Sequence, residues 1–152
     1  MTPNKFIIRV YGIVVNHKKE VLLSDEYVLE MKMTKFPGGG LEFGEGLIEG
    51  LKREFAEECN GQEIENIRHF YTTDFYQKAL FYENAQLISI YYLVHLKYPL
   101  RFLVSDKAFD FEMGSSVTQS FRWKKIKELK EEDITFPIDK FVVQKLKQTF
   151  NE

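Results

Sequence analysis

Three closely spaced glutamates provide the strongest structural signal in this sequence. Residues 39–58 read GGLEFGEGLIEGLKREFAEE, in which Glu54, Glu57 and Glu58 fall at positions i, i+3 and i+4. An α-helix would place these three carboxylates along one edge. Like charges at this spacing repel one another, and hard divalent cations such as Mg²⁺ or Mn²⁺ relieve the repulsion by binding between the oxygens. The spacing therefore predicts a metal site on a helix.

A glycine-rich stretch precedes the predicted helix. Pro37 is followed by Gly38, Gly39 and Gly40. A glycine backbone reaches torsions that are closed to other residues and can approach a ligand without interference from a Cβ atom. We therefore expect the main-chain carbonyls of this stretch to be available as further metal ligands.

An apolar stripe predicts the helix itself, which begins after Gly46. The end is predicted at Asn60 and Gly61, since both residues tolerate the left-handed conformation common at a helix C-terminus. The only cysteine of the chain lies on this stripe, where we expect a small buried hydrophobic residue rather than a nucleophile. The stripe consists of Ile48, Leu51, Phe55 and Cys59.

Residues 39–61 resemble the signature of the Nudix hydrolases, G-x5-E-x7-R-E-U-x-E-E-x-G-U, in which U is a bulky aliphatic or aromatic residue. The chain departs from the signature only at its end, where Asn60 and Gly61 replace the terminal glycine and the aliphatic residue. We interpret this as a helix cap displaced by one residue. The signature is met by Gly39, Glu45, Arg53, Glu54, Phe55, Glu57 and Glu58.

The resemblance implies roles for these residues. Glu54, Glu57 and Glu58 would carry the metal ions, with the Gly38 carbonyl as a further ligand. Glu54 could also act as general base through a metal-bound water. Arg53 would fix the direction of the glutamates through its planar donor group.

Glu45 would hold the site in shape together with Arg53. The alternative is a solvated helix face, on which Arg53 makes only surface ion pairs worth at most about 1 kcal/mol each. The glycine stretch and the complete spacing favour the metal site.

Other site residues follow less directly. Relatives in this family place the base on a loop well after the signature, where the candidates are Glu112 and Asp110, although residues 114–122 contain no carboxylate. Arg9, Lys32 and Lys35 could meet substrate phosphates. We weigh against this the simpler interpretation that at least two of these three are solvated charges.

Composition bounds the class of protein. The 152 residues, 44% of them hydrophobic, suit a single domain over residues 1–152 with a core of ordinary size. A formal charge of −2 provides no general attraction for nucleic acid or anionic membrane. Neither a secretory signal nor a membrane span is recognisable, so a cytoplasmic location is expected.

Apolar patterning predicts strands mixed with two helices, and hence an α/β protein whose sheet is covered on both faces. The fold of the resembled family, an α/β/α sandwich around a mixed β-sheet, is consistent with this pattern. Beyond the helix described above, we expect a strand at 6–15 in a hairpin with 21–23, a loop or short strand at 25–35, strands at 64–73, 86–97 and 120–124, and a closing helix from Pro137.

The resemblance implies a Mg²⁺- or Mn²⁺-dependent hydrolase of acid anhydrides, which cuts a phosphoanhydride in a nucleoside diphosphate linked to another group, with an ADP-sugar or ADP-ribose type favoured. Two alternatives stay open: a nucleoside triphosphate pyrophosphohydrolase and a non-catalytic nucleotide sensor. The substrate would be a small molecule. The aromatic-rich region 71–98 suggests a possible homodimer.

Overall fold

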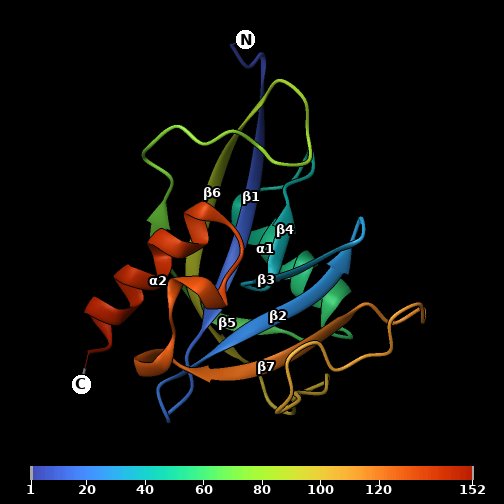
Figure 1. The fold of residues 1–152 in the computed structure, drawn as a ribbon. Coiled ribbons are helices and arrows are strands. Elements are labelled where there is room, and N and C mark those ends of the chain that lie inside the picture. The colour runs from blue at the N-terminus through green and yellow to red at the C-terminus, as the bar shows by residue number, and fades with distance from the viewer. Residues whose placement is uncertain (1, 152) are drawn as a thin grey trace.

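The computed structural model describes residues 2–151, which fold into seven strands, two α-helices and two short 3₁₀ helices (Figure 1). The elements are β1 (Lys5–Val14), β2 (Glu20–Val28), β3 (Met31–Lys35), β4 (Gly38–Gly40), α1 (Leu47–Glu58), β5 (Ile64–Thr72), β6 (Ala85–Leu96), β7 (Gln119–Lys125), η1 (Ile126–Glu128), η2 (Glu131–Asp133) and α2 (Pro137–Thr149).

The central sheet is mixed and has the strand order β4-β1-β6-β5. Its middle pair, β1 and β6, is parallel, whereas β4 and β5 pair with their neighbours in antiparallel direction. A second, antiparallel sheet has the order β3-β2-β7. The helices α1 and α2 lie on opposite sides of the central sheet (Figure 1). This arrangement confirms the predicted α/β/α sandwich.

The alternation of side chains along β1 explains why both faces are covered. Tyr11 and Ile13 enter the core that includes α2, while Val10 and Val14 enter the core that includes α1. Successive side chains of a strand point to opposite faces, so one apolar strand contributes to both cores. Between them, Gly12 leaves the space that Phe55 of α1 fills, since a Cβ atom at Gly12 would lie 2.5 Å from the phenyl ring.

The predicted hairpin between residues 6–15 and 21–23 is wrong in its pairing. The chain does reverse direction after β1, and Val15 forms a single antiparallel bridge with Val21. The strands β1 and β2 nevertheless enter different sheets. One edge of β1 pairs with β6 over residues 5–14 and the other pairs with β4 at residues 9–11, while β2 pairs with β3 and β7.

Residues 25–35 are more regular than predicted, because they contain the end of β2 and the whole of β3. These strands form an antiparallel hairpin in which Val28 pairs with Met31. The turn residues, Leu29 and Glu30, have φ values of 52° and 61°. Such two-residue turns usually carry Asn-Gly or a similar pair, so Leu-Glu provides no recognisable signal. The remaining strands and α2 agree with their predicted ranges to within about two residues.

Helix α1 begins and ends where the sequence predicts. The Glu49 side chain accepts a hydrogen bond from the Gly46 N–H at 3.0 Å, and positive φ angles at Asn60 and Gly61 end the helix. The predicted stripe is wrong at its first position, because Ile48 is 43% exposed. Leu47, one turn before the buried Leu51, packs against the core in its place.

Cys59 is fully buried, as predicted. Burial raises the pKa of its thiol to about 12, which disfavours the nucleophilic thiolate. Among residues 2–151, neither helix has the length and apolar character that a membrane crossing requires.

Candidate active site

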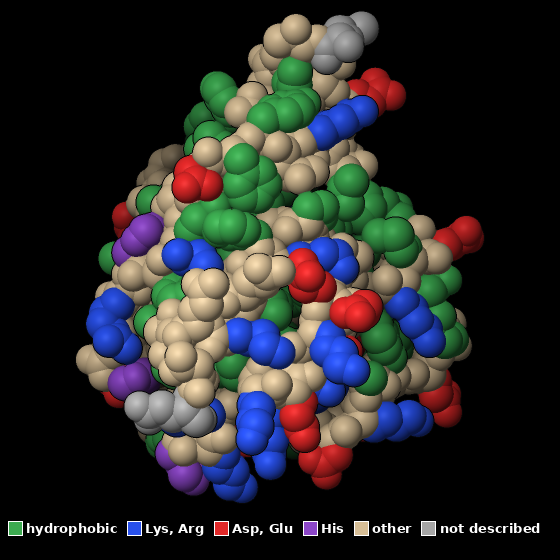
Figure 2. Space-filling view, turned by 60° about the vertical axis from the view of Figure 1, so that its left-hand side comes forward, with side chains coloured by type: hydrophobic (Ala, Val, Ile, Leu, Met, Phe, Trp, Pro, Cys, Tyr) green, Lys and Arg blue, Asp and Glu red, His purple; other side chains and the backbone are tan. Residues whose placement is uncertain are grey.

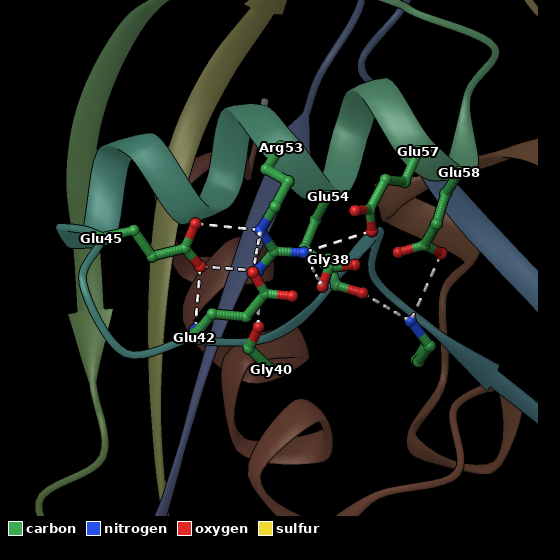
Figure 3. Close-up of polar contacts among 9 residues, drawn as sticks. Gly38, Gly40, Glu42, Glu45, Arg53, Glu54, Glu57 and Glu58 are labelled. Carbon is green, nitrogen blue, oxygen red and sulfur yellow. Dashed lines mark hydrogen bonds and ion pairs between the residues drawn. The ribbon is translucent and has the colours of Figure 1, made fainter.

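Arg53 lies at the centre of the polar cluster under helix α1 (Figure 3). Its Nε and Nη2 atoms donate to the two carboxylate oxygens of Glu45 at 2.9 and 2.6 Å. The Nη2 atom also donates to the Gly40 carbonyl at 2.9 Å, and Nη1 donates to Glu54 at 3.0 Å and to Glu57 at 3.2 Å. One guanidinium group therefore connects the preceding loop, strand β4 and two glutamates of the helix.

The pair of Glu45 and Arg53 is held in its charged form. Hydrogen bonding from Arg53, followed by the backbone N–H of Glu42, lowers the pKa of Glu45 to about 2. The same contact with Glu45 raises the pKa of Arg53. A carboxylate and a guanidinium in this two-bond geometry form one of the stronger side-chain contacts of proteins.

Gly39 lets strand β4 approach the helix. A Cβ atom at this position would lie 2.5 Å from the carboxyl carbon of Glu54. The Glu54 carboxylate consequently lies directly against the backbone of β4, next to the glycine carbonyls. Gly38 is required for a different reason: its φ is 146°, and a Cβ atom there would lie 2.1 Å from the Val10 carbonyl oxygen.

Glu58 is a partly buried carboxylate, 18% exposed, that lies among other carboxylates. Burial raises its pKa to about 7, and the neighbouring Glu54 and Glu26 act in the same direction. Lys35, with its Nζ atom 3.9 Å away, and Gln119, which donates to Glu58 at 2.6 Å, act in the opposite direction. The cluster therefore carries repulsion between like charges that a further cation would relieve.

Lys35 occupies an unexpected place. Its side chain is only 6% exposed, and its Nζ atom donates to the Gly38 carbonyl at 3.0 Å and pairs with Glu26 at 3.0 Å. Glu58 provides a third oxygen at 3.9 Å. The interpretation of Lys35 as a solvated charge is wrong, because the hairpin of β2 and β3 turns this residue inward, toward the glycine stretch.

The donor set suits a hard divalent cation. Carboxylate oxygens of Glu54 and Glu58 and the carbonyl of Gly38 are the kind of ligand that Mg²⁺ prefers. Within residues 2–151, however, no three His, Cys, Asp or Glu side chains are arranged as a ready metal site. The carboxylates are divided between two cations, since Glu57 faces Arg53 and Glu58 faces Lys35.

A cavity of about 420 Å³ adjoins the cluster. Lys35 and Glu26 belong to its lining, and Lys35 connects the two, since its Nζ atom pairs with Glu26 and lies 3.9 Å from Glu58. The remaining wall is largely apolar and aromatic, which is typical of small-molecule sites of this size. Its aromatic side chains include Tyr11, Phe81, Tyr82, Tyr91 and Phe136.

Asp139, a lining residue that the sequence analysis missed, is 1% exposed in the first turn of α2. Tyr91 donates its hydroxyl to Oδ1, whereas Oδ2 has no hydrogen-bond partner within the described residues. Burial raises the pKa of Asp139 to about 6. The sequence does carry a signal for this burial: Asp139 lies three and four residues before the apolar Val142 and Val143, and therefore on the same face of the helix.

The other predicted contacts lie in different places. Arg9 is half-buried, donates through Nε to the Tyr11 hydroxyl and lines the cavity. Lys32 is exposed, as a solvated charge would be. Asp110 accepts a hydrogen bond from Ser105 at 2.6 Å.

No hydrogen bond or ion pair within residues 2–151 connects Asp110 or Glu112 with the glutamates of α1. Their role as general base stays a prediction. Glu26 and Gln119 were missed because they meet through the pairing of β2 with β7, which local patterning does not reveal.

The comparisons with known proteins agree with this fold. A family model of the NUDIX domain matches residues 5–144. A comparison with curated proteins finds no match.

Among solved structures, one of MutT, from work on Aliivibrio salmonicida and Vibrio cholerae, shares 24% identity, covers 95% of this chain and 99% of its own, and has a TM-score of 0.63. A NUDIX hydrolase from Nitrosomonas europaea shares 17% identity over 94% of this chain and 88% of its own, with a TM-score of 0.67. A MutT protein from Bacillus halodurans shares 21% identity, and the match covers 91% of this chain and 80% of its own, with a TM-score of 0.63.

These structural likenesses show the fold. The match of the domain model extends over nearly the whole chain and includes both the signature helix and the strands that surround it. This chain belongs to the Nudix hydrolase family, whose members generally depend on a divalent metal and hydrolyse a pyrophosphate linkage in nucleoside diphosphate-linked substrates.

Proposed function

We propose that this protein uses Mg²⁺ or Mn²⁺ to hydrolyse a phosphoanhydride bond in a nucleoside diphosphate linked to another group, of the ADP-sugar or ADP-ribose type. One observation carries the proposal: the Glu54 and Glu58 carboxylates and the Gly38 carbonyl gather beside a cavity large enough for a nucleoside. The cavity and the cluster share Lys35 and Glu26.

The metal would be held by Glu54, Glu57 and Glu58 with the Gly38 carbonyl. Once bound, such a cation supplies shielding of the negative charge on the diphosphate oxygens and lowers the pKa of a bound water. Arg53 positions Glu54 and Glu57 by donating to both carboxylates.

Glu45 positions Arg53 in turn, through two hydrogen bonds. Lys35 and Arg9 line the cavity, as does Lys78, and we assign the contacts with substrate phosphates to Lys35 and Arg9. Glu54 and, at greater distance along the chain, Glu112 are the candidates for the general base.

The nucleoside would occupy the cavity. Phe81, Tyr82 and Phe136 present aromatic surface on which a base can pack.

The activity is tested with purified protein and a panel of nucleotide sugars, dinucleotides and nucleoside triphosphates, with and without Mg²⁺ or Mn²⁺. We expect metal-dependent turnover that releases two monophosphates. Glu58→Gln should abolish most of the turnover, while Glu65→Gln, an exposed glutamate on β5, should not. Circular dichroism checks that both variants are folded. No turnover of any compound with either metal would refute the proposal.

A nucleoside triphosphate pyrophosphohydrolase is the second candidate. Release of pyrophosphate instead of two monophosphates would identify this activity. Thermal stabilisation by nucleotides without turnover would instead identify a sensor.

A further inference from the structure

Lys35 is held by oxygens that a metal ion would also use. Its Nζ atom lies 3.0 Å from the Gly38 carbonyl oxygen and 3.9 Å from Oε1 of Glu58. Both are among the ligands assigned to the metal above. The ammonium group of Lys35 therefore lies next to the oxygens that would bind the metal ion.

The surroundings of Lys35 show that this position is built into the fold. The side chain is 6% exposed, and its third oxygen, Oε2 of Glu26, lies at 3.0 Å. Glu26 is oriented by Ser24, whose hydroxyl donates to it at 2.8 Å, and by Gln119, whose amide donates at 3.2 Å. The same Gln119 amide donates to Glu58 at 2.6 Å. Strands β2 and β4 and helix α1 thus each contribute one oxygen to a cage around one ammonium group.

We propose that Lys35 is an internal cation, which competes with the divalent metal ion for the Gly38 carbonyl and the Glu58 carboxylate. The inference depends on the metal site of the proposed function. A divalent ion and an ammonium group cannot share these two oxygens at contact distance, because their positive charges repel. The metal therefore binds fully only when Lys35 moves away.

The cavity provides the space for this movement. Lys35 already lines it, together with Arg9 and Tyr11, and its ammonium group lies 5.7 Å from the centre of the Tyr11 ring. Movement away from Gly38 would carry the ammonium group into the cavity, where the phosphates of a bound nucleotide would meet it. Metal binding would in this way prepare the substrate site.

Removal of the competing charge tests the proposal. Binding of Mn²⁺ is measured from the electron paramagnetic resonance signal of the free ion, with wild-type protein, Lys35→Met and Lys35→Gln. Both variants should bind Mn²⁺ roughly tenfold more tightly, which corresponds to about 1.4 kcal/mol of binding free energy, or should bind one additional Mn²⁺ ion. Lys32→Met, an exposed lysine on the same strand, should retain wild-type affinity. Unchanged or weaker Mn²⁺ binding by folded Lys35 variants would overturn the proposal.

A measurement on wild-type protein covers the case in which the variants do not fold. Reductive methylation of lysines is followed residue by residue with mass spectrometry, in the absence and presence of saturating Mg²⁺. Modification of Lys35 should increase several-fold with Mg²⁺, while that of Lys32 stays constant. Equal or reduced modification of Lys35 would overturn the proposal.

The two proposals fail in distinguishable ways. Tight Mn²⁺ binding and metal-dependent turnover by wild-type protein, with no effect of Lys35 substitution, would reject the competition and keep the hydrolase. Absence of Mn²⁺ binding in wild-type protein and in both variants would reject both.

Discussion

Arg53 Nη2 donates a hydrogen bond to Glu45 Oε1 across 2.6 Å, and this contact joins helix α1 to the loop that precedes it. The same Nη2 atom donates to the Gly40 carbonyl, Nε donates to the other oxygen of Glu45, and Nη1 donates to two glutamates of the helix. Because one planar group makes all of these contacts, its geometry decides where the carboxylates point.

Replacement of Arg53 by lysine should lower turnover roughly 10- to 100-fold, as is typical for residues that orient metal ligands. Lysine keeps the charge but cannot donate to Glu45, Gly40 and Glu54 at once. Turnover and circular dichroism provide the measurement, with Lys52→Gln on the exposed side of the same helix as control. Wild-type turnover in Arg53→Lys would mean that charge alone suffices.

Gly39→Ala should displace the Glu54 carboxylate and weaken Mn²⁺ binding. The added methyl group would lie 2.5 Å from the carboxyl carbon, and crowding of this kind typically costs about 1–3 kcal/mol. The neighbouring Gly40→Ala is the matched control, because its Cβ atom would meet only the Arg9 Nη1 atom, at 3.9 Å. Equal Mn²⁺ affinity of the two variants would contradict the close approach of β4 to the helix.

Asp139 should make the stability of the protein depend on pH. Burial raises its pKa from 3.8 to about 6 on folding, so the folded protein binds more protons than the unfolded chain between these values. The free energy of unfolding should therefore decrease as the pH rises through this window, by about 3 kcal/mol in total at about 1.4 kcal/mol per pKa unit.

Asp139→Asn removes this titration. Urea unfolding at intervals from about pH 4 to about pH 8 should show the variant gaining stability relative to wild type as the pH rises. Asp106→Asn, at an exposed position, should follow the wild-type curve. Parallel curves for Asp139→Asn and wild type would show that the carboxyl titrates alike in both states.

A homodimer and a cytoplasmic location stay predictions. Figure 2 shows hydrophobic side chains in the upper part of one face, and Tyr76 and Leu80, between β5 and β6, are 58% and 57% exposed. Light scattering should give the mass of a dimer, and Tyr76→Ser combined with Leu80→Ser should reduce it to that of a monomer. A monomeric mass for wild-type protein would exclude the dimer, and cell fractionation tests the location.

Local sequence patterns alone predict helix α1 and the order of the polar residues along it. Carboxylate spacing, glycine-rich backbone and helix-ending residues are all local properties, because residues three and four apart in a helix are neighbours whatever the rest of the chain does. The same local reasoning located β5, β6, β7 and α2. It could not reveal which strands pair, since pairing brings together backbone groups that are far apart in the chain.

The surroundings of the glutamates, in contrast, depend on contacts between segments that lie far apart in the chain. Lys35 resembles any other lysine of a charged strand until the β2–β3 hairpin turns it toward Gly38. Asp139 resembles an ordinary acidic residue of a first helical turn until α2 packs against Tyr91 and buries it. Burial and the identity of a charge partner arise from contacts across the whole chain, and these set the electrostatics of a site.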